Sequence, residues 1–367
     1  MKHEPDAPST ANQAAPAPTH RPSETGFGHA ASCLRRCGDC GRCPAASKPA
    51  FPAVEIKPGV TAALAEDLGR VLAQARSPAE DALLAQAEAG AEALAAAVPE
   101  LRRQADALKA PHGPPALVIR GLPVDDIRDI TDPTPLGALV ALSLARLIGH
   151  SFQYRQQNGG RLVAELRAKP AFAGKANTGE SNLPFEDHTD DRAFAPDHAC
   201  EWIGLVGIRN SARVATTYTP IAPVLRHLPA EQLRVLTEPR YSSRAPTSFG
   251  FRMQVWTPPV PVLWRAAGEW EVGLPTYNCR PADAADTVAA EALAALKRLL
   301  GEERFRVPVV VGKGVALIFA NNRGLHGRAG YEGERLLLRT YIRRSLDTLR
   351  AKSGEPGPVF DAWDLLR

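Results

Sequence analysis

The feature that most constrains the fold of this chain is a series of short, strand-like segments that begins at Phe152 and continues almost to the C-terminus. Examples are EWIGLVGI (201–208), GVALIFA (314–320) and RLLLRTYIR (335–343), which are rich in β-branched residues and leucine and are separated by turns containing Gly or Pro. Many short strands at close spacing are typical of a β-sandwich or jelly roll. We therefore predict a mainly β fold with flanking helices and a jelly-roll core.

The region before these strands has a helical pattern. Apolar residues recur at intervals of three and four in TAALAEDLGRVLAQA (61–75) and AEDALLAQAEAGAEALAAAV (79–98), and two further helices are predicted over 135–149 and 286–300. The first 50 residues are rich in Pro, Ala, Ser, Thr and His without any period, which indicates a disordered tail. We predict this tail over 1–50, a helical region over 51–115 that packs on the core, and the jelly-roll domain over 116–367.

Charge and hydropathy exclude some classes of partner. The net charge is +4 with acids and bases interspersed, whereas nucleic-acid binding usually requires a concentrated basic surface. No apolar run approaches the roughly 20 residues that a membrane span requires. We expect neither a nucleic-acid partner nor a membrane segment, and we expect a cytoplasmic protein.

Four of the six cysteines lie close together in the predicted tail, as Cys33, Cys37, Cys40 and Cys43. Four thiolates at this spacing could bind zinc or an iron–sulfur cluster. The spacing differs from the ferredoxin order and the tail offers few apolar residues to enclose a metal. A redox-sensitive or incidental cluster is therefore the favoured interpretation.

The segment HTDD suggests a metal site. His188 and Asp190 are two residues apart, and on a strand such residues project from the same face. His326, which follows the apolar segment 314–320, is the candidate third ligand. Two histidines and one carboxylate on one side of a metal form the facial triad of non-haem iron(II) oxygenases. An isolated H-x-D motif is common by chance, so the argument also depends on the residues that follow His326.

Two arginines follow His326 on a predicted strand. Arg335 and Arg339 are four residues apart and share a face if the segment 335–343 is extended. Inward-facing cations are costly unless they bind an anion. The alternative is that they pair with Glu332, Glu334 or other acids at a sheet edge.

These segments resemble, in order, the motifs of a known enzyme family. The pieces are GHSFQYRQQNGGRLVAEL, HTDD, RVATTYTP, LTEPRYSSRAPTSFG, and NNRGLHGR followed by GER and LLLR. The stretch from about 116 to 346 resembles the clavaminate synthase-like branch of the taurine dioxygenase superfamily. Within that branch it is most similar to hydroxylases of arginine, asparagine or lysine.

The resemblance implies a double-stranded β-helix (a cupin-like jelly roll) and a set of residue roles. Fe(II) would be bound by His188, Asp190 and His326, which would form the catalytic centre. Arg335 would bind the distal carboxylate of the co-substrate 2-oxoglutarate, aided by a hydroxyl from Thr216 or its neighbour Thr217. Substrate contacts would come from Arg339, from Gln157 or Gln156, and from Ser181 or Asn182.

The implied reaction is hydroxylation of an unactivated C–H bond of a small amino acid or its derivative, with O2 consumed and succinate and CO2 released. Family members that act on basic amino acids often carry an Asp where this chain has Pro275, Thr276 and Asn278. Asp187 and Asp191 could replace it, or they could be solvated turn residues. Two alternatives remain: the same chemistry on a carrier-tethered aminoacyl group or a small sulfonate or carboxylate, and a non-catalytic jelly-roll binding protein.

Overall fold

The structure is a computed structural model that describes residues 50–75, 77, 79–246, 249 and 255–366. The predicted tail up to residue 49, including the cluster Cys33, Cys37, Cys40 and Cys43, lies outside the described residues. So does most of the segment FRMQVW (251–256), another of the strand-like segments that follow Phe152. No described helix is long and apolar enough to span a membrane.

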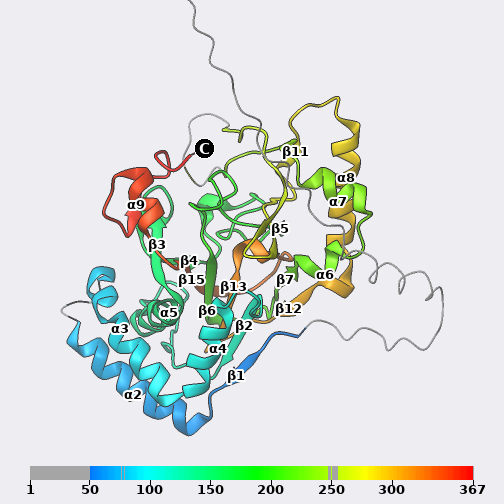
Figure 1. The fold of residues 1–367 in the computed structure, drawn as a ribbon. Coiled ribbons are helices and arrows are strands. Elements are labelled where there is room, and N and C mark those ends of the chain that lie inside the picture. The colour runs from blue at the N-terminus through cyan, green and yellow to red at the C-terminus, as the bar shows by residue number, and fades with distance from the viewer. Residues whose placement is uncertain (1–49, 76, 78, 247–248, 250–254, 367) are drawn as a thin grey trace, which may run out of the picture. The chain divides into compact units, whose positions relative to one another are not determined.

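The described chain begins with β1 and a group of three helices, and most of its strands follow later in the sequence (Figure 1). The α-helices are α2 (Pro58–Gln74), α3 (Glu80–Ala97), α4 (Pro99–Lys109), α5 (Pro135–Ile148), α6 (Ile221–Leu225), α7 (Ala230–Leu236), α8 (Thr287–Leu300) and α9 (Asp347–Ser353). The strands are β1 (Ala53–Glu55), β2 (Ala116–Arg120), β3 (His150–Tyr154), β4 (Val163–Leu166), β5 (Phe185–His188), β6 (Trp202–Asn210), β7 (Thr216–Pro220), β8 (Tyr241–Ser243), β9 (Leu263–Ala266), β10 (Glu269–Val272), β11 (Cys279–Pro281), β12 (Val307–Val309), β13 (Val315–Ala320), β14 (Gly324–Arg328), β15 (Arg335–Arg343) and β16 (Val359–Phe360).

Two sheets form the core of the fold. The large sheet has the order β1-β2-β13-β6-β15-β3-β16, with β4 also paired to β15, and the small sheet has the order β12-β7-β14-β5. Apart from the parallel pairs β1–β2 and β3–β16, the pairings within these sheets are antiparallel. Neighbours in each sheet are distant in sequence, as in a jelly roll. The predicted mainly β fold with a double-stranded β-helix core is confirmed.

The large sheet is buried on both faces. Along β15, Leu336, Leu338 and Ile342 belong to the apolar cluster formed with α2–α5. The intervening Leu337 and Tyr341 belong to a second apolar cluster between the sheets. Because side chains alternate between the faces of a strand, the near-continuous apolar sequence of β15 fills both layers.

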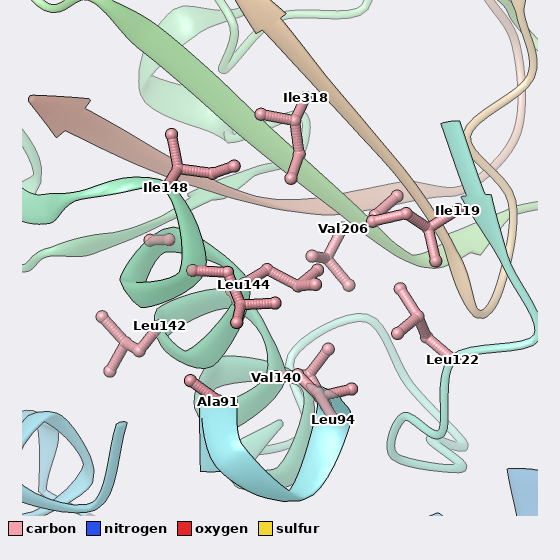
Figure 2. Packing of buried hydrophobic residues seen from close by; sticks show 14 of the residues in the cluster. Ala91, Leu94, Ile119, Leu122, Val140, Leu142, Leu144, Ile148, Val206 and Ile318 are labelled. Carbon is pink, nitrogen blue, oxygen red and sulfur yellow. The ribbon is translucent and has the colours of Figure 1, made fainter. Parts of the chain in front are cut away.

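The layer of helices packs on the outer face of this sheet through α5. That helix is apolar on nearly all sides, so it can be covered by α3 on one side and by the sheet on the other. Figure 2 shows Leu144 and Val140 of α5 between Leu94 of α3 and Val206 and Ile318 of the sheet. The helices thus cover the outer face of the sheet, while its inner face packs on the second apolar cluster and also carries Arg335 and Arg339.

Shortening one buried side chain of this helical layer tests its packing. Leu94 is fully buried, so Leu94→Ala is expected to lower the free energy of unfolding by about 2–5 kcal/mol, through lost burial and the cavity left behind. Val288→Ala, at an exposed position in α8, is the control and should change it by less than about 0.5 kcal/mol. Denaturant unfolding measures both; equal effects would contradict the assigned packing.

A third apolar cluster lies between β7 and β12 in sequence. It joins α6, α7 and α8 to β8–β11 and includes Leu236, Tyr241, Leu274 and Leu296. Residues 244–246, after β8, and residues 275 and 277–278, before β11, lie outside this cluster and line the cavity beside the small sheet. This insertion therefore contributes residues to the site as well as its own core.

Candidate active site

The two histidines lie on adjacent strands of the small sheet. β5 ends at His188, β14 carries His326, and the two residues are register partners. Directly opposed residues of an antiparallel pair place their side chains on the same face. Accordingly, the ring centroids of His188 and His326 are 4.1 Å apart. Strand pairing thus brings together two histidines 138 positions apart in the sequence (326 − 188).

Asp190 joins them by a different route from the predicted one. The strand-based interpretation of the H-x-D spacing is wrong in this respect, because β5 stops at His188 and Asp190 lies in the following turn. Asn321 holds that turn: its Oδ1 accepts a hydrogen bond from the Asp190 backbone N at 2.9 Å, and its Nδ2 donates to the Asp190 carbonyl at 3.1 Å. The same amide also donates to the Cys200 carbonyl at 3.2 Å. A buried side chain from the segment before β14 therefore positions the carboxylate.

The three side chains are arranged to hold a cation. One ligand atom from each lies within 4.8 Å of the others. His188 Nδ1 donates to the Glu186 carbonyl at 2.7 Å, which leaves Nε2 as the free lone pair. His188 Nε2 and His326 Nδ1 are buried and have no hydrogen-bond partner among the described residues. Burial lowers the pKa of His326 to about 3, so its ring is neutral near pH 7 and can act as a ligand.

Asp190 is held as a carboxylate. Its burial alone would raise the pKa, but the close approach of His188, whose Nε2 lies 3.2 Å from Asp190 Oδ1, the nearby His326 and the Arg339 guanidinium together lower the pKa well below the usual range. Tyr341 donates a hydrogen bond to Asp190 Oδ2 at 2.7 Å, and Arg339 Nη1 lies 3.5 Å from the same atom. The charge and orientation of this ligand are fixed before any metal binds.

Arg335 is a buried cation without an acid partner. Its residue exposure is 4%, and no described carboxylate lies within ion-pair distance. The predicted alternative partner Glu334 pairs with Arg209 instead, at 3.1 Å. Burial and the nearby Arg328 lower the pKa of Arg335 to about 10, which still leaves it charged near pH 7. An uncompensated guanidinium in this position indicates an anion-binding site.

The structure distinguishes the two candidate threonines. Thr216 Oγ1 lies 3.5 Å from Arg335 Nη2 and lines the same cavity. Thr217 points to the opposite face of β7, where its hydroxyl donates to the Gly327 carbonyl at 3.1 Å. Thr216 is therefore the hydroxyl available to an anion beside Arg335.

Arg339 and Gln157 lie together at the predicted substrate side. Arg339 Nη2 donates to Gln157 Oε1 at 3.3 Å, and its guanidinium stacks over the Tyr341 ring at 4.1 Å. Gln156 is instead bound to the C-terminal segment: its Nε2 donates to Asp361 and its Oε1 accepts from the Ala362 backbone. Of the two glutamines, Gln157 is the one beside Arg339.

Ser181 has a different environment from the predicted one. Its Oγ accepts a hydrogen bond from the Leu183 backbone N at 3.2 Å, and it is absent from the described lining of the cavity. Its carbonyl, with those of Thr178 and Leu183, accepts hydrogen bonds from the buried Arg328 guanidinium. Residues 178–183 are therefore held by Arg328, and Ser181 has a role in that turn.

Two adjoining cavities open on the three candidate ligands. The larger, of about 870 Å³, is lined by His188, Asp190, Gln157 and Arg339 among others. A narrow extension of about 50 Å³ continues past His326 to Arg335 and Thr216. The arrangement gives one space for a short dianion with its far end at Arg335, and a separate, larger space for a second molecule.

Some site residues have no individual signal in the sequence. Asn321 and Arg328 stand in the segment NNRGLHGR beside His326, and Tyr341 lies two residues after Arg339 on the same strand face, so the strand period could have placed it. Arg244, which also lines the larger cavity, comes from the distant turn after β8. Only tertiary packing brings it to the site.

Comparison with known proteins shows the same architecture in solved oxygenases. No protein-family model and no curated protein matches the sequence. An asparagine oxygenase solved with Fe(II), 2S,3S-3-hydroxyasparagine and succinate is 22% identical, with a TM-score of 0.72, over 84% of this chain and 99% of that one. The non-haem iron oxygenase OrfP, solved with Fe and alpha-ketoglutaric acid, is 23% identical, with a TM-score of 0.70, over 87% of this chain and 100% of that one.

This chain has the fold of these amino-acid oxygenases. A second structure of OrfP, with Fe, succinate and (3R,4R)-dihydroxy-L-Arg, matches with a TM-score of 0.72 at 22% identity, covering 84% of this chain and 100% of that one. The similarity extends over nearly the full length of each solved chain. The fold implied by the sequence resemblance is therefore confirmed.

The position of Asn321 leads to a second prediction. Asn321→Ala removes the two hydrogen bonds to the Asp190 backbone and the one to the Cys200 carbonyl, so we expect the affinity for Mn(II) to fall about 10- to 100-fold. Titration calorimetry measures it. Asn322→Ala, which removes the neighbouring amide but none of the bonds to residue 190, should bind normally. Equal affinity in wild type and Asn321→Ala would show that the turn is held by other contacts.

Proposed function

We propose that this protein is an Fe(II)- and 2-oxoglutarate-dependent dioxygenase that hydroxylates an unactivated C–H bond of a small amino acid or amino-acid derivative. One observation carries the proposal: the His188, Asp190 and His326 group shares a cavity with the buried, uncompensated Arg335. A metal site alone would suit many reactions. A metal site with an anion receptor at a fixed position beside it suits a chelating oxoacid.

The ligand set fits iron. One ligand atom each from His188, Asp190 and His326 lies within 4.8 Å of the others, and each histidine has one buried ring nitrogen without a hydrogen-bond partner among the described residues. This donor set is typical of Fe(II) oxygenases and leaves positions for other ligands. When bound, Fe(II) with 2-oxoglutarate activates O2 to oxidise a C–H bond, and succinate and CO2 are released.

The narrow extension fits the oxoacid. Arg335 would receive the distal carboxylate through its planar fork, and Thr216 would add a hydroxyl donor. The buried side chains of Ile203 and Leu205 line the same extension and exclude water from the pair. A charge-assisted hydrogen bond is strongest in such a site, because water does not compete for it.

The larger cavity fits the substrate. Arg339 faces it beside Gln157 and can hold a substrate carboxylate. Solved proteins of the same fold bind asparagine- and arginine-derived products, which supports a small-molecule amino-acid substrate. A carrier-tethered aminoacyl group or a small sulfonate or carboxylate could use the same cation.

The non-catalytic alternative predicts that a metal ligand or the oxoacid receptor is lost, whereas His188, Asp190, His326 and Arg335 are all retained. We further propose the cytoplasm as the compartment of the reaction. In the described part of the chain Cys200 and Cys279 are free thiols, which supports a compartment where thiols are kept reduced.

Visible spectroscopy without oxygen tests the proposal. Adding Fe(II) and then 2-oxoglutarate to the purified full chain should produce a weak charge-transfer band in the middle of the visible range. The band should require both components and should be absent with succinate in place of 2-oxoglutarate. With iron bound and no band formed, the oxygenase proposal would be rejected in favour of a binding protein.

A further inference from the structure

The larger cavity has a second cationic group whose role the proposed reaction does not explain. Arg244 follows β8 and lines this cavity together with Asn278, Tyr277 and two of the proposed metal ligands, His188 and Asp190. Its Nε is buried without a hydrogen-bond partner, and its Nη2 donates to Asn278 Oδ1 at 3.1 Å. No described carboxylate is within ion-pair distance of it. The guanidinium is therefore positioned by a neutral amide and keeps its full charge toward the cavity.

The chain segment next to Arg244 offers no counter-ion in its sequence. No Asp or Glu occurs between residues 245 and 268, a stretch that includes the undescribed residues 247–248 and 250–254. The backbone of Arg244 is also fixed, because its N donates to the Asn278 carbonyl at 3.0 Å. The side chain thus extends from a held backbone toward the cavity.

The acidic groups that a basic substrate would need are already engaged. Asp187 forms a partly buried ion pair with Arg306 at 3.2 Å. Asp191 is buried and accepts hydrogen bonds from Tyr154 Oη and the Cys200 backbone N, so neither acid is the solvated turn residue considered above.

Two further carboxylates line the cavity. Glu180 pairs with Lys169, and Glu186 is exposed to water, where it accepts a hydrogen bond from Asn177. None of the carboxylates in the described lining lies within ion-pair distance of Arg244.

Arg244 lines the same cavity as His188 and Asp190. Tyr277 lies near both sides of this space: its ring centroid is 6.1 Å from that of His188, and its neighbour Asn278 accepts the hydrogen bond from Arg244. Arg339 lies beside Asp190 and faces the same cavity. A substrate held by both arginines would lie across the metal ligands.

We propose that Arg244, supported by Asn278, is the specificity-determining group for the distal carboxylate of a dicarboxylic amino acid, whose α-carboxylate is bound by Arg339. This inference rests on the proposed function and names its substrate class. Two cations facing one cavity match the two carboxylates of aspartate or glutamate. The same charges repel the side chains of arginine and lysine, so the site selects by repulsion as well as by attraction.

Binding without turnover tests this assignment. The full chain is loaded with 2-oxoglutarate and with Mn(II), which replaces iron so that no hydroxylation takes place. It is then titrated in a calorimeter with L-aspartate, L-glutamate and L-arginine. We expect one of the two acidic amino acids to bind at least about 10-fold more tightly than L-arginine. Arg244→Gln should weaken that binding about 30-fold or more, and Arg244→Lys should weaken it less.

A variant that introduces a negative charge beside Arg244 gives a second, independent test of the assignment. Asn278→Asp places a carboxylate against the Arg244 guanidinium at nearly unchanged side-chain volume, so it should also weaken binding of the acidic amino acid. Arg226→Gln, an exposed position outside the described lining of the cavity, makes the same charge change as Arg244→Gln and should have no effect. The affinity for 2-oxoglutarate should be unchanged in every variant, which also shows that each is folded.

The outcomes separate the two proposals. Tight binding of L-arginine by the wild type, no binding of either acidic amino acid, or an Arg244→Gln variant that binds normally would overturn the assignment of Arg244 while metal and 2-oxoglutarate binding stand. Failure of the wild type to bind Mn(II) and 2-oxoglutarate would overturn the proposed function and this inference with it.

Discussion

Replacing His326 with alanine is expected to abolish specific iron binding and to lower turnover by about 1,000-fold or more. Of the three proposed ligands only His188 and Asp190 would remain, which is too few to hold iron in place. The ring that is lost is neutral and buried with an unpartnered nitrogen, so the native fold gains little from it besides metal binding. Iron content after gel filtration and succinate release per enzyme measure the effect.

The control for this substitution is His112→Ala. His112 is exposed and contacts Glu269 outside the described lining of the cavity, so its removal should leave iron content and turnover unchanged. Circular dichroism should show that both variants are folded. Iron content and turnover within about tenfold of wild type in folded His326→Ala would show that this residue is not a ligand.

Replacing Arg335 with alanine is expected to raise the dissociation constant of 2-oxoglutarate about 100-fold or more. Removing one partner of a buried, hydrogen-bonded charge pair makes the free energy of binding less favourable by about 2–5 kcal/mol. Among the described residues, the other arginines that line the narrow extension are Arg328 and Arg339. Titration of the charge-transfer band with 2-oxoglutarate gives the constant directly. Iron binding should be unaffected, because Arg335 is not one of the three ligands.

A stability measurement separates an anion receptor from a structural arginine. Arg335 is buried without a counter-ion, so Arg335→Met should leave the free energy of unfolding of the unliganded protein unchanged or raise it. Arg328→Met is the comparison: its guanidinium holds the carbonyls of Thr178, Ser181 and Leu183, so its loss should be destabilising. Marked destabilisation by Arg335→Met, with 2-oxoglutarate affinity unchanged, would contradict the proposed role.

Much of the fold follows from local pattern. The helical period of residues 135–149 and 286–300 corresponds to α5 and α8, and the apolar segments 314–320 and 335–343 correspond to β13 and β15. The period of two in β15 places Arg335 and Arg339 on the face opposite Leu336 and Leu338, which pack against the helices. These features depend only on residue type and spacing, and such information is local to the sequence.

Other features depended on pairings between distant segments. β14, which carries His326, is short and has little apolar pattern, and it is a strand because β5 and β7 pair with it on either side. Thr216 and Thr217 are indistinguishable in sequence until the register of β7 turns one toward Arg335 and the other toward Gly327.

The sequence by itself determined which residue types form the site, which residues share each face of β15, and the likeness to a family of iron oxygenases. The tertiary structure decided that Asp190 reaches the histidines from a turn held by Asn321, that Ser181 belongs to a turn held by Arg328, and that Arg244 faces the cavity. The physical reason is that side-chain period is fixed within a strand, whereas the position of a turn is fixed by hydrogen bonds to residues far away in the chain.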